Sequence, residues 1–432
     1  MPALRRLTLE IEWHLHTIQA HYILKATPNL QKLTLRGAQE LYNGQKERLF
    51  RRNFSSHASD IGFDGKTVEL EHLLEFCVFK NIARLKIRKL KLFRFVLSEQ
   101  MMEYVQPEEL RYLQIQNCQT PSGTLSALRP ERMQLHTFRF MYKNFRRDYQ
   151  IYFDFIGQLK PGLQQLVCGI VVMHRFYNPE VQIELTRRLP LPFGFAEKHG
   201  DTLKYFCYHL GGKDGPTYLP DQDSEDIAPT GLWNLRELSL PLKTQKANNV
   251  VQPDYAEGEE WKSIQQPVSL TANKLDGLKC LYSLTFSPIS DHYRISVLDT
   301  ILNYVDSGFI QDMESGYPKP RDRRNSLMVK YVEEARLLQD FVGEVATFYG
   351  CQLPTAAGPP TLKWISFLSG YQLSEDKRFG YKVEWTLEEN SSTSEKYTSR
   401  VIFVRDADTQ MESEGLELRT PKIDLGGARL FS

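Results

Sequence analysis

The sequence lacks the segments that would place the chain in a membrane or an oxidising compartment. No run approaches the roughly 18 apolar residues that a helix needs to span a bilayer, and the N-terminus has no apolar signal-peptide core. The six cysteines lie 39 or more residues apart and form no C-x-x-C pair. These absences favour reduced, buried thiols over disulfides or zinc sites. We therefore expect an intracellular protein of the cytoplasm, the nucleus or both.

The signatures of common enzyme classes are also missing. The sequence contains no G-x-x-x-x-G-K-[ST], G-x-G-x-x-G, H-E-x-x-H or G-x-S-x-G motif, each of which would mark a nucleotide site or a hydrolytic centre. We expect a protein that is not an enzyme, with no catalytic residue, no metal site and no cofactor. An enzyme is the third hypothesis, after the two binding functions described below, and a convergent pocket of titratable groups would favour it.

The net charge is close to zero, but the charges are unevenly distributed. The 432 residues include 54 Lys and Arg and 53 Asp and Glu. Residues 1–216 hold 31 basic and 21 acidic residues, a net charge of +10, and residues 217–432 hold the remaining 23 and 32, a net charge of −9. The balance of the whole argues against a polybasic nucleic-acid binder. The difference between the halves indicates where to look for a partner.

A six-residue frame, L-x-x-L-x-L with aliphatic or aromatic substitutes, recurs along most of the chain. Its short intervals of 25 to 28 residues fall in the range of leucine-rich repeats. The last two apolar positions are two apart, so on a strand they point into the same core, which stacked copies would share. Cys118 completes the Leu110 frame at the position where the repeat has Asn or Cys. The frames begin at Leu4, Leu30, Ile82, Leu110, Leu135, Leu163, Leu203, Leu235, Leu281 and Leu362.

Segments with helical periodicity lie between the frames, at 96–106, 149–159, 193–199, 294–305 and 326–349. Alternating strand, turn and helix predict an α/β fold: a leucine-rich-repeat solenoid with a curved parallel sheet and helices on its convex side. Two alternating stretches around a polar turn, within 381–405, predict a C-terminal β-hairpin cap.

One solenoid over residues 1–405 is the domain organisation that we expect. Polar, turn-rich segments at about 211–230, 243–267 and 316–325 are predicted to be insertions in the repeats. Residues 406–432 are predicted to be a disordered tail.

The sequence resembles the leucine-rich-repeat portions of fungal F-box-type proteins. The resemblance rests on the degenerate frames, the segment FAEKHGDTLKYF at Phe195–Phe206, the long polar insertions and the terminal hairpin, and it covers most of residues 1–405. In that family an F-box docks the adaptor of a cullin ubiquitin ligase, and the repeats hold the substrate. The first frame begins at Leu4, so we expect no F-box in this chain and carry over no F-box residue. The chain would be a truncated member or a repeat-only protein.

The residues that alternate with the core positions would form the exposed concave face of the sheet. On the early frames this face is basic, and like charges side by side repel one another unless an acidic partner relieves them. The leading hypothesis is therefore an interaction scaffold that holds an acidic or phosphorylated protein partner, and the alternative is a merely solvated face. The candidate partner-binding residues are Arg6, Lys32, Arg36, Arg84, Lys86, Arg88, Tyr112, Gln114 and Arg139.

Nucleic-acid binding by the basic N-terminal half is the second hypothesis. Residues 46–52 and 143–147 add positive charge to that half. This hypothesis predicts an affinity that falls steeply with salt concentration. We expect no binding to membranes.

Overall fold

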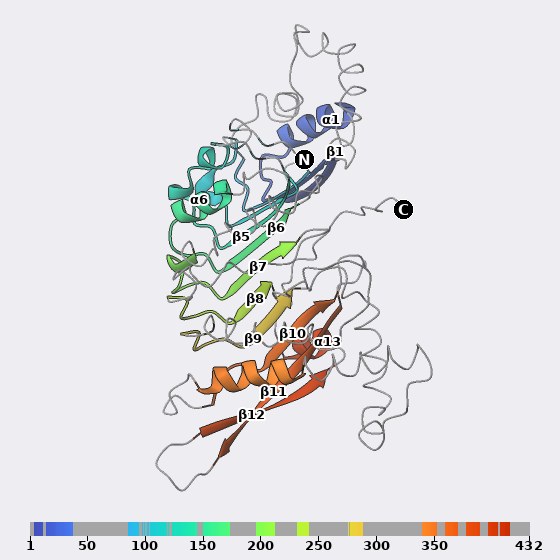
Figure 1. The fold of residues 1–432 in the computed structure, drawn as a ribbon. Helices are drawn as coiled ribbons and strands as arrows, with labels where there is room; N and C mark the ends of the chain where they lie inside the picture. The colour runs from blue at the N-terminus through green and yellow to red at the C-terminus, as the bar shows by residue number, and fades with distance from the viewer. Residues whose placement is uncertain are drawn as a thin grey trace, which may run out of the picture. The chain divides into compact units, whose positions relative to one another are not determined.

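The structure is a computed structural model of the chain, shown in Figure 1. It describes residues 4–11, 14–37, 85–94, 97, 99, 102, 104–118, 120, 123–144, 150–172, 196–211, 231–241, 275, 277–287, 339–351, 359–369, 377–388, 396–404 and 407–414. The fold is mixed α/β, and its strands follow one another in a mostly parallel sheet in the order β1 to β12. The described residues fall into two compact units, one from residues 4 to 171 and one from residues 172 to 414.

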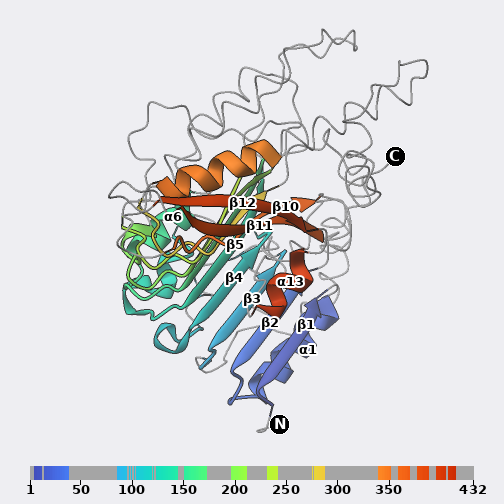
Figure 2. The same ribbon diagram turned by 90° about the horizontal axis from the view of Figure 1, so that it is seen from below.

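The first unit contains a run of parallel strands in sequence order, which Figure 2 shows for β1 to β5. The register aligns Leu33 of β2 with Leu90 of β3, and Leu113 of β4 with Phe138 of β5. The elements are β1 Arg6–Ile11, α1 His14–Lys25, β2 Lys32–Gly37, β3 Lys89–Phe93, η2 Pro107–Glu109, β4 Tyr112–Gln116, η3 Ser126–Leu128, η4 Pro130–Arg132, β5 Thr137–Asn144, α6 Gln150–Gln158 and β6 Gln165–Val172.

The apolar pairs of the frames form the core of this unit. Leu33 and Leu35, for example, are buried, and the matching pairs on β3, β4 and β5 are buried in the same rows. The predicted helix at 149–159 is confirmed by α6, which packs aromatic side chains on this face: the rings of Phe140 and Tyr152 stack with centroids 4.5 Å apart. Because α6 covers the core face, the alternate residues of β1 to β5 lie on the opposite face of the sheet.

The frame predicted at Ile82 is shifted in the structure. Strand β3 begins at Lys89, and Leu90 and Leu92 are the residues that align with the β2 leucines. Leu85 forms an isolated bridge with Val105 instead. Lys86 and Arg88 are exposed and precede the strand, so their expected place on the strand is wrong, and Arg84 lies outside the described residues. The sequence LKIRKLKLF offers two apolar pairs, and pairing with β2 selects the second.

The turn after β4 matches the repeat pattern. Cys118 is buried, and its thiol donates to the carbonyl oxygen of Gln116 at 3.5 Å. Asn117 has a φ of 53° and its N–H donates to the carbonyl of Met141 at 2.8 Å. Asn adopts this left-handed conformation more readily than most residues. The backbone N–H of the turn is therefore satisfied, whereas the buried Oδ1 of Asn117 has no hydrogen-bond partner among the described residues.

The second unit contains parallel strands followed by antiparallel ones. β7 pairs with β8, β8 with β9 and β9 with β10, all in parallel, whereas β11 runs antiparallel to both β10 and β12. The hairpin predicted within 381–405 is confirmed by β11 and β12. The elements are β7 Tyr205–Gly211, β8 Glu237–Pro241, β9 Ser283–Ser287, β10 Trp364–Ser369, β11 Lys377–Glu388, β12 Lys396–Val404 and α13 Ala407–Ser413, with a further helix at 339–351.

The helix at 339–351 is fixed to the sheet by one buried tyrosine. The Tyr349 hydroxyl donates to the carbonyl of Leu278 at 2.7 Å, and the Phe341 ring packs edge-on against Phe286. Gly350 faces the indole of Trp385, where a Cβ would lie 2.6 Å from the ring. This helix therefore covers the core face of the β9 region.

Several expectations concern the remainder of the chain. The predicted insertions at about 211–230, 243–267 and 316–325 lie outside the described residues, apart from Gly211 at the end of β7. The expectation of a disordered tail from residue 406 is wrong in part. Ala407–Ser413 form helix α13, in which Ala407 and Met411 are buried. No helix in the described part of the chain is long and apolar enough to cross a membrane.

Candidate functional site

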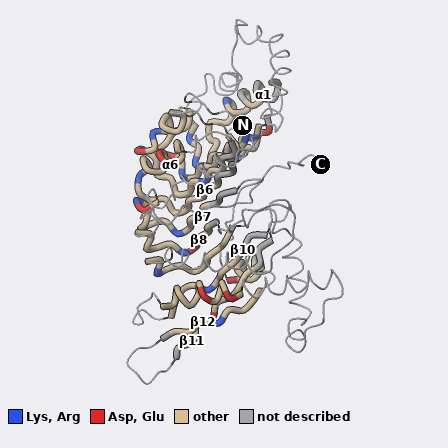
Figure 3. The backbone as a smooth tube through the Cα atoms, in the orientation of Figure 1, with Lys and Arg blue, Asp and Glu red and all other residues tan. Residues whose placement is uncertain are grey.

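Six cations occupy outward positions on four strands of the first unit, and we call this set the basic face. Arg6 of β1 lies beside Lys32 of β2, and Lys32 lies beside Lys89 of β3, in the same row of the register. Figure 3 marks lysines and arginines along the backbone in blue and acidic residues in red. The basic face consists of Arg6, Lys32, Arg36, Lys89, Lys91 and Arg139.

Tyr112 of β4 lies among these cations. The Nζ of Lys89 lies 4.2 Å from the centroid of the Tyr112 ring, the Nζ of Lys91 lies 5.7 Å from it, and the Cζ of Arg139 lies 5.8 Å from it. Cations at these distances over a ring face are attracted by its quadrupole. Arg36 has a similar contact with Phe93, at 5.3 Å. The aromatic rings thus hold positive charges that would otherwise repel one another.

The lysines of the basic face are electrostatically crowded. Burial lowers the pKa of Lys89, and the charges of Lys32 and Arg139 lower it further. Burial likewise lowers the pKa of Lys91, followed by the charges of Lys89 and Arg139. Both causes act against the protonated form. A nearby anion would act in the opposite direction, because it favours the protonated form.

Hydrogen bonds along β4 fix the polar residues beside the cations. The Tyr112 hydroxyl donates to Oε1 of Gln114 at 2.8 Å, and Nε2 of Gln114 donates to Oε1 of Gln116 at 3.3 Å. The buried Nε of Arg139 has no hydrogen-bond partner among the described residues. Guanidinium groups pair well with carboxylates and phosphates. The Nε of Arg139 is thus an unsatisfied donor inside the fold, and it is not accessible to a ligand at the surface.

Negative charge is scarce near the basic face. On the outward positions of β1 to β5, as far as the described residues extend, Glu10 of β1 is the one carboxylate, and it is exposed. No ion pair joins a described carboxylate to a cation of the basic face. The register places Glu10 beside Arg36, and the other five cations of the basic face have no carboxylate next to them on the described strands.

Most of the predicted site residues lie together in the structure. The register places Arg6 of β1 beside Lys32 of β2, and it places Lys32 and Arg36 beside β3. Tyr112, Gln114 and Arg139 follow on β4 and β5. Sequence reasoning missed Lys89 and Lys91, because the frame was placed at Ile82. The three-residue gap between Ile87 and Leu90, which breaks the alternation just before the strand, is the signal that would have found them.

Lys, Arg, Tyr and Gln side chains dominate the outward positions of these strands. No cluster of three His, Cys, Asp or Glu suited to a metal ion occurs in the described ranges. Comparison with models of known protein families and with curated protein sequences gives no match.

Proposed function

We propose that this chain is a non-enzymatic interaction scaffold of leucine-rich-repeat type whose basic face binds an acidic protein partner. The observation that carries the proposal is the crowding of Lys89, Lys91 and Arg139 around Tyr112 with no described carboxylate paired to them. An arrangement that places like charges on adjacent strands is unfavourable alone and favourable with an anionic ligand.

The leucine-rich-repeat part of the proposal is supported by the parallel strands within each unit, because the apolar pairs of β2 to β5, and those of β8 and β9, are buried. Parallel strands joined by helices or 3₁₀ turns are what stacked repeats produce. In this proposal the chain is the substrate-recognition part of an F-box ubiquitin-ligase receptor. The ligase link has its own test: the chain, expressed with any in-frame segment preceding it in the gene, should co-purify with a cullin adaptor.

Binding of defined acidic probes tests the basic face. We suggest two fluorescein-labelled Glu-rich peptides that differ only in one serine, which is phosphorylated in the second. Lys89→Glu with Lys91→Glu should weaken binding of either peptide at least tenfold, because each attraction becomes a repulsion. Added salt should also weaken binding to the wild-type chain, since the basic face is partly exposed.

A matched control uses cations on the other side of the sheet. Lys25 at the end of α1 and Lys160 after α6 are exposed, and their reversal to Glu changes the net charge equally. This control variant should bind the peptides about as well as the wild-type chain. Equal losses in both double variants would show that only the overall charge matters and would refute the basic face as the site. Tighter binding of a DNA duplex than of either peptide would favour the nucleic-acid alternative.

A further inference from the structure

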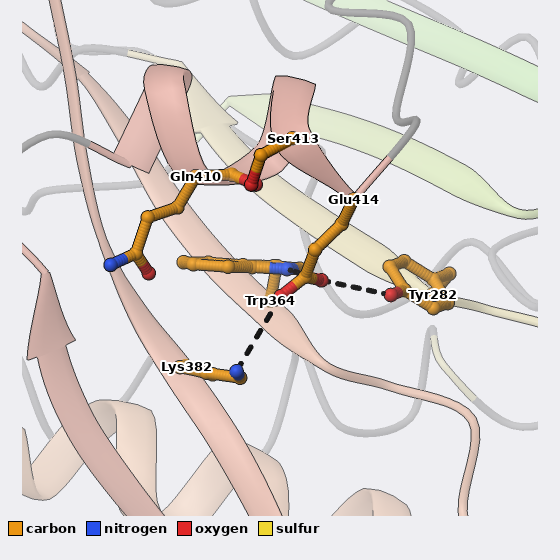
Figure 4. Close-up of polar contacts among 6 residues, drawn as sticks. All are labelled: Tyr282, Trp364, Lys382, Gln410, Ser413 and Glu414. Carbon is orange, nitrogen blue, oxygen red and sulfur yellow. Dashed lines mark hydrogen bonds and ion pairs between the residues drawn. The ribbon is translucent and has the colours of Figure 1, made fainter.

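Three hydrogen-bond donors from neighbouring strands of the second unit converge on one carboxylate, as Figure 4 shows. The Tyr282 hydroxyl and the Trp364 Nε1–H both donate to Oε2 of Glu414, each at 3.0 Å. The Nζ of Lys382 lies 3.4 Å from Oε1 of the same group. We call Tyr282, Trp364 and Lys382 the carboxylate anchor.

The sheet itself sets the geometry of the carboxylate anchor. Trp364 begins β10 and is aligned with Lys382 of β11 on one side and with Ser283, next to Tyr282, on the other. Burial raises the pKa of Tyr282 to about 12, and the hydrogen bond to Glu414 adds to this effect. The phenol therefore keeps its proton at neutral pH and remains a donor.

The helix that carries Glu414 contacts the sheet through one side. Trp364, Ala407 and Met411 form a buried cluster, against which Tyr282 and Val404 pack. Ala407 and Met411 are four residues apart, and Glu414 follows three residues later, so all three lie on the same helix face. One helix face thus presents two apolar contacts and a carboxylate.

Helix α13 is a peptide-like occupant of this surface. It has seven residues, far fewer than the roughly 12–15 at which isolated helices become marginally stable in water. Two residues separate it from β12. Its helical state therefore depends on the carboxylate anchor and the apolar cluster, and it can leave the sheet without breaking a strand pair.

We propose that the β9–β11 surface is a docking site for a short amphipathic helix that carries a carboxylate, and that α13 is its resident occupant. The partner helix carries an apolar pair four residues apart and an acidic residue three positions later. It displaces α13, and its carboxylate accepts the hydrogen bonds of the carboxylate anchor. This inference goes beyond the acidic-partner proposal, because it concerns other residues, in the second unit.

A tethered occupant competes strongly. A short linker holds α13 at an effective concentration in the millimolar range, so a free peptide should bind the wild-type chain weakly. A variant of the full chain in which α13 binds the sheet less tightly should leave the site open to a free peptide. The double variant Met411→Asp with Glu414→Gln serves this purpose. It places a charge where Met411 is buried, and it removes the carboxylate that the anchor binds.

The probe is a fluorescein-labelled peptide of residues 406–416, and the matched control is the same peptide with Glu414→Gln. The double-variant chain should bind the probe at least tenfold more tightly than the wild-type chain does. It should bind the control peptide at least tenfold more weakly than the probe. A double-variant chain that unfolds cooperatively yet binds neither peptide, or binds both equally, would overturn the proposal.

A second measurement does not depend on a variant. In isotope-labelled wild-type chain, millimolar unlabelled peptide should reduce the hydrogen-exchange protection of residues 407–414, and the Glu414→Gln peptide should not. Unchanged protection with both peptides would contradict displacement. Lys89→Glu with Lys91→Glu should leave both results as they are, which separates this proposal from the one on the basic face.

Discussion

The ammonium group of Lys89 on β3 lies 4.2 Å from the ring centroid of Tyr112 on the neighbouring strand β4. Lys91 and Arg139 approach the same ring. One aromatic side chain thus contacts three cations. The ring attracts each positive charge, whereas the cations on neighbouring strands repel one another. Four predictions follow from this and from other contacts of the structure.

Replacing Tyr112 should destabilise the first unit. Tyr112→Leu removes the ring below the cations, and the free energy of unfolding should fall by about 1 kcal/mol, because cation–π contacts contribute roughly 0.5–1 kcal/mol at exposed sites. Tyr112→Phe keeps the ring and removes only the donation to Gln114, so it should lose less. Urea denaturation measures both, and a Leu variant at least as stable as the Phe variant would contradict the role of the ring.

Removing one cation from the basic face should stabilise the fold while it weakens partner binding. Lys91→Met keeps the unbranched stem and removes a charge whose protonated form is disfavoured by burial and by Lys89. Relief of like charges on adjacent strands should contribute roughly 0.2–1 kcal/mol, more at low salt. The control, Lys160→Met at an exposed position, should change little. A loss of stability in Lys91→Met at low salt, by urea denaturation, would refute this explanation.

The contribution of Glu414 should disappear in acid. Burial alone would raise its pKa, but the hydrogen bonds from Trp364 and Tyr282 and the charge of Lys382 lower it overall. A carboxyl whose folded pKa lies below its unfolded value, about 4.3 for Glu, stabilises the fold above that value. The stability is lost as the pH falls through the folded pKa.

The measurement for Glu414 is the stability difference between the wild-type chain and Glu414→Gln across pH. The wild-type chain should be more stable at pH 6, and the difference should shrink as the pH drops below about 4. A difference that stays constant from pH 6 to pH 3 would show that the carboxylate charge contributes nothing.

Two glycine substitutions should act in opposite directions. A Cβ on Gly200 would overlap the carbonyl oxygen of Gly231, so backbone must move, and overpacking of this kind costs roughly 1–3 kcal/mol. Gly343 lies within the helix at 339–351 with open space around a Cβ, and Gly→Ala inside a helix contributes about 0.5–1 kcal/mol. Thermal or urea unfolding of Gly200→Ala and Gly343→Ala tests the pair, and the same sign in both would contradict the geometry.

The sequence was sufficient to predict the strand frames at Leu30 and Leu110, because their apolar pairs have period two and are bounded by turn residues. It was insufficient at β3, where two apolar pairs stand three residues apart and only pairing with Leu33 and Leu35 distinguishes them. Local pattern gives the type of element. The choice between two adjacent candidates depends on the neighbouring strand.

The carboxylate anchor was beyond prediction for a different reason. Glu414 accepts from Tyr282 and Trp364, which are 132 and 50 residues away in sequence. No sequence repeat relates these three positions. Helix α13 is also too short for its apolar residues to be recognised as a helical pattern in a polar segment. Such contacts become visible only when the sheet has placed its strands side by side.

The change of strand direction at β11 also constrains how this protein can evolve. A duplicated strand with its connection, inserted between β2 and β5 or between β7 and β10, would find a parallel neighbour on each side and could join the sheet through an ordinary crossover. One inserted after β11 would meet a strand that runs the other way and is already paired with β12. Lengthening by duplication should therefore occur among the parallel strands, and relatives with more or fewer strands should differ there while they retain the final hairpin.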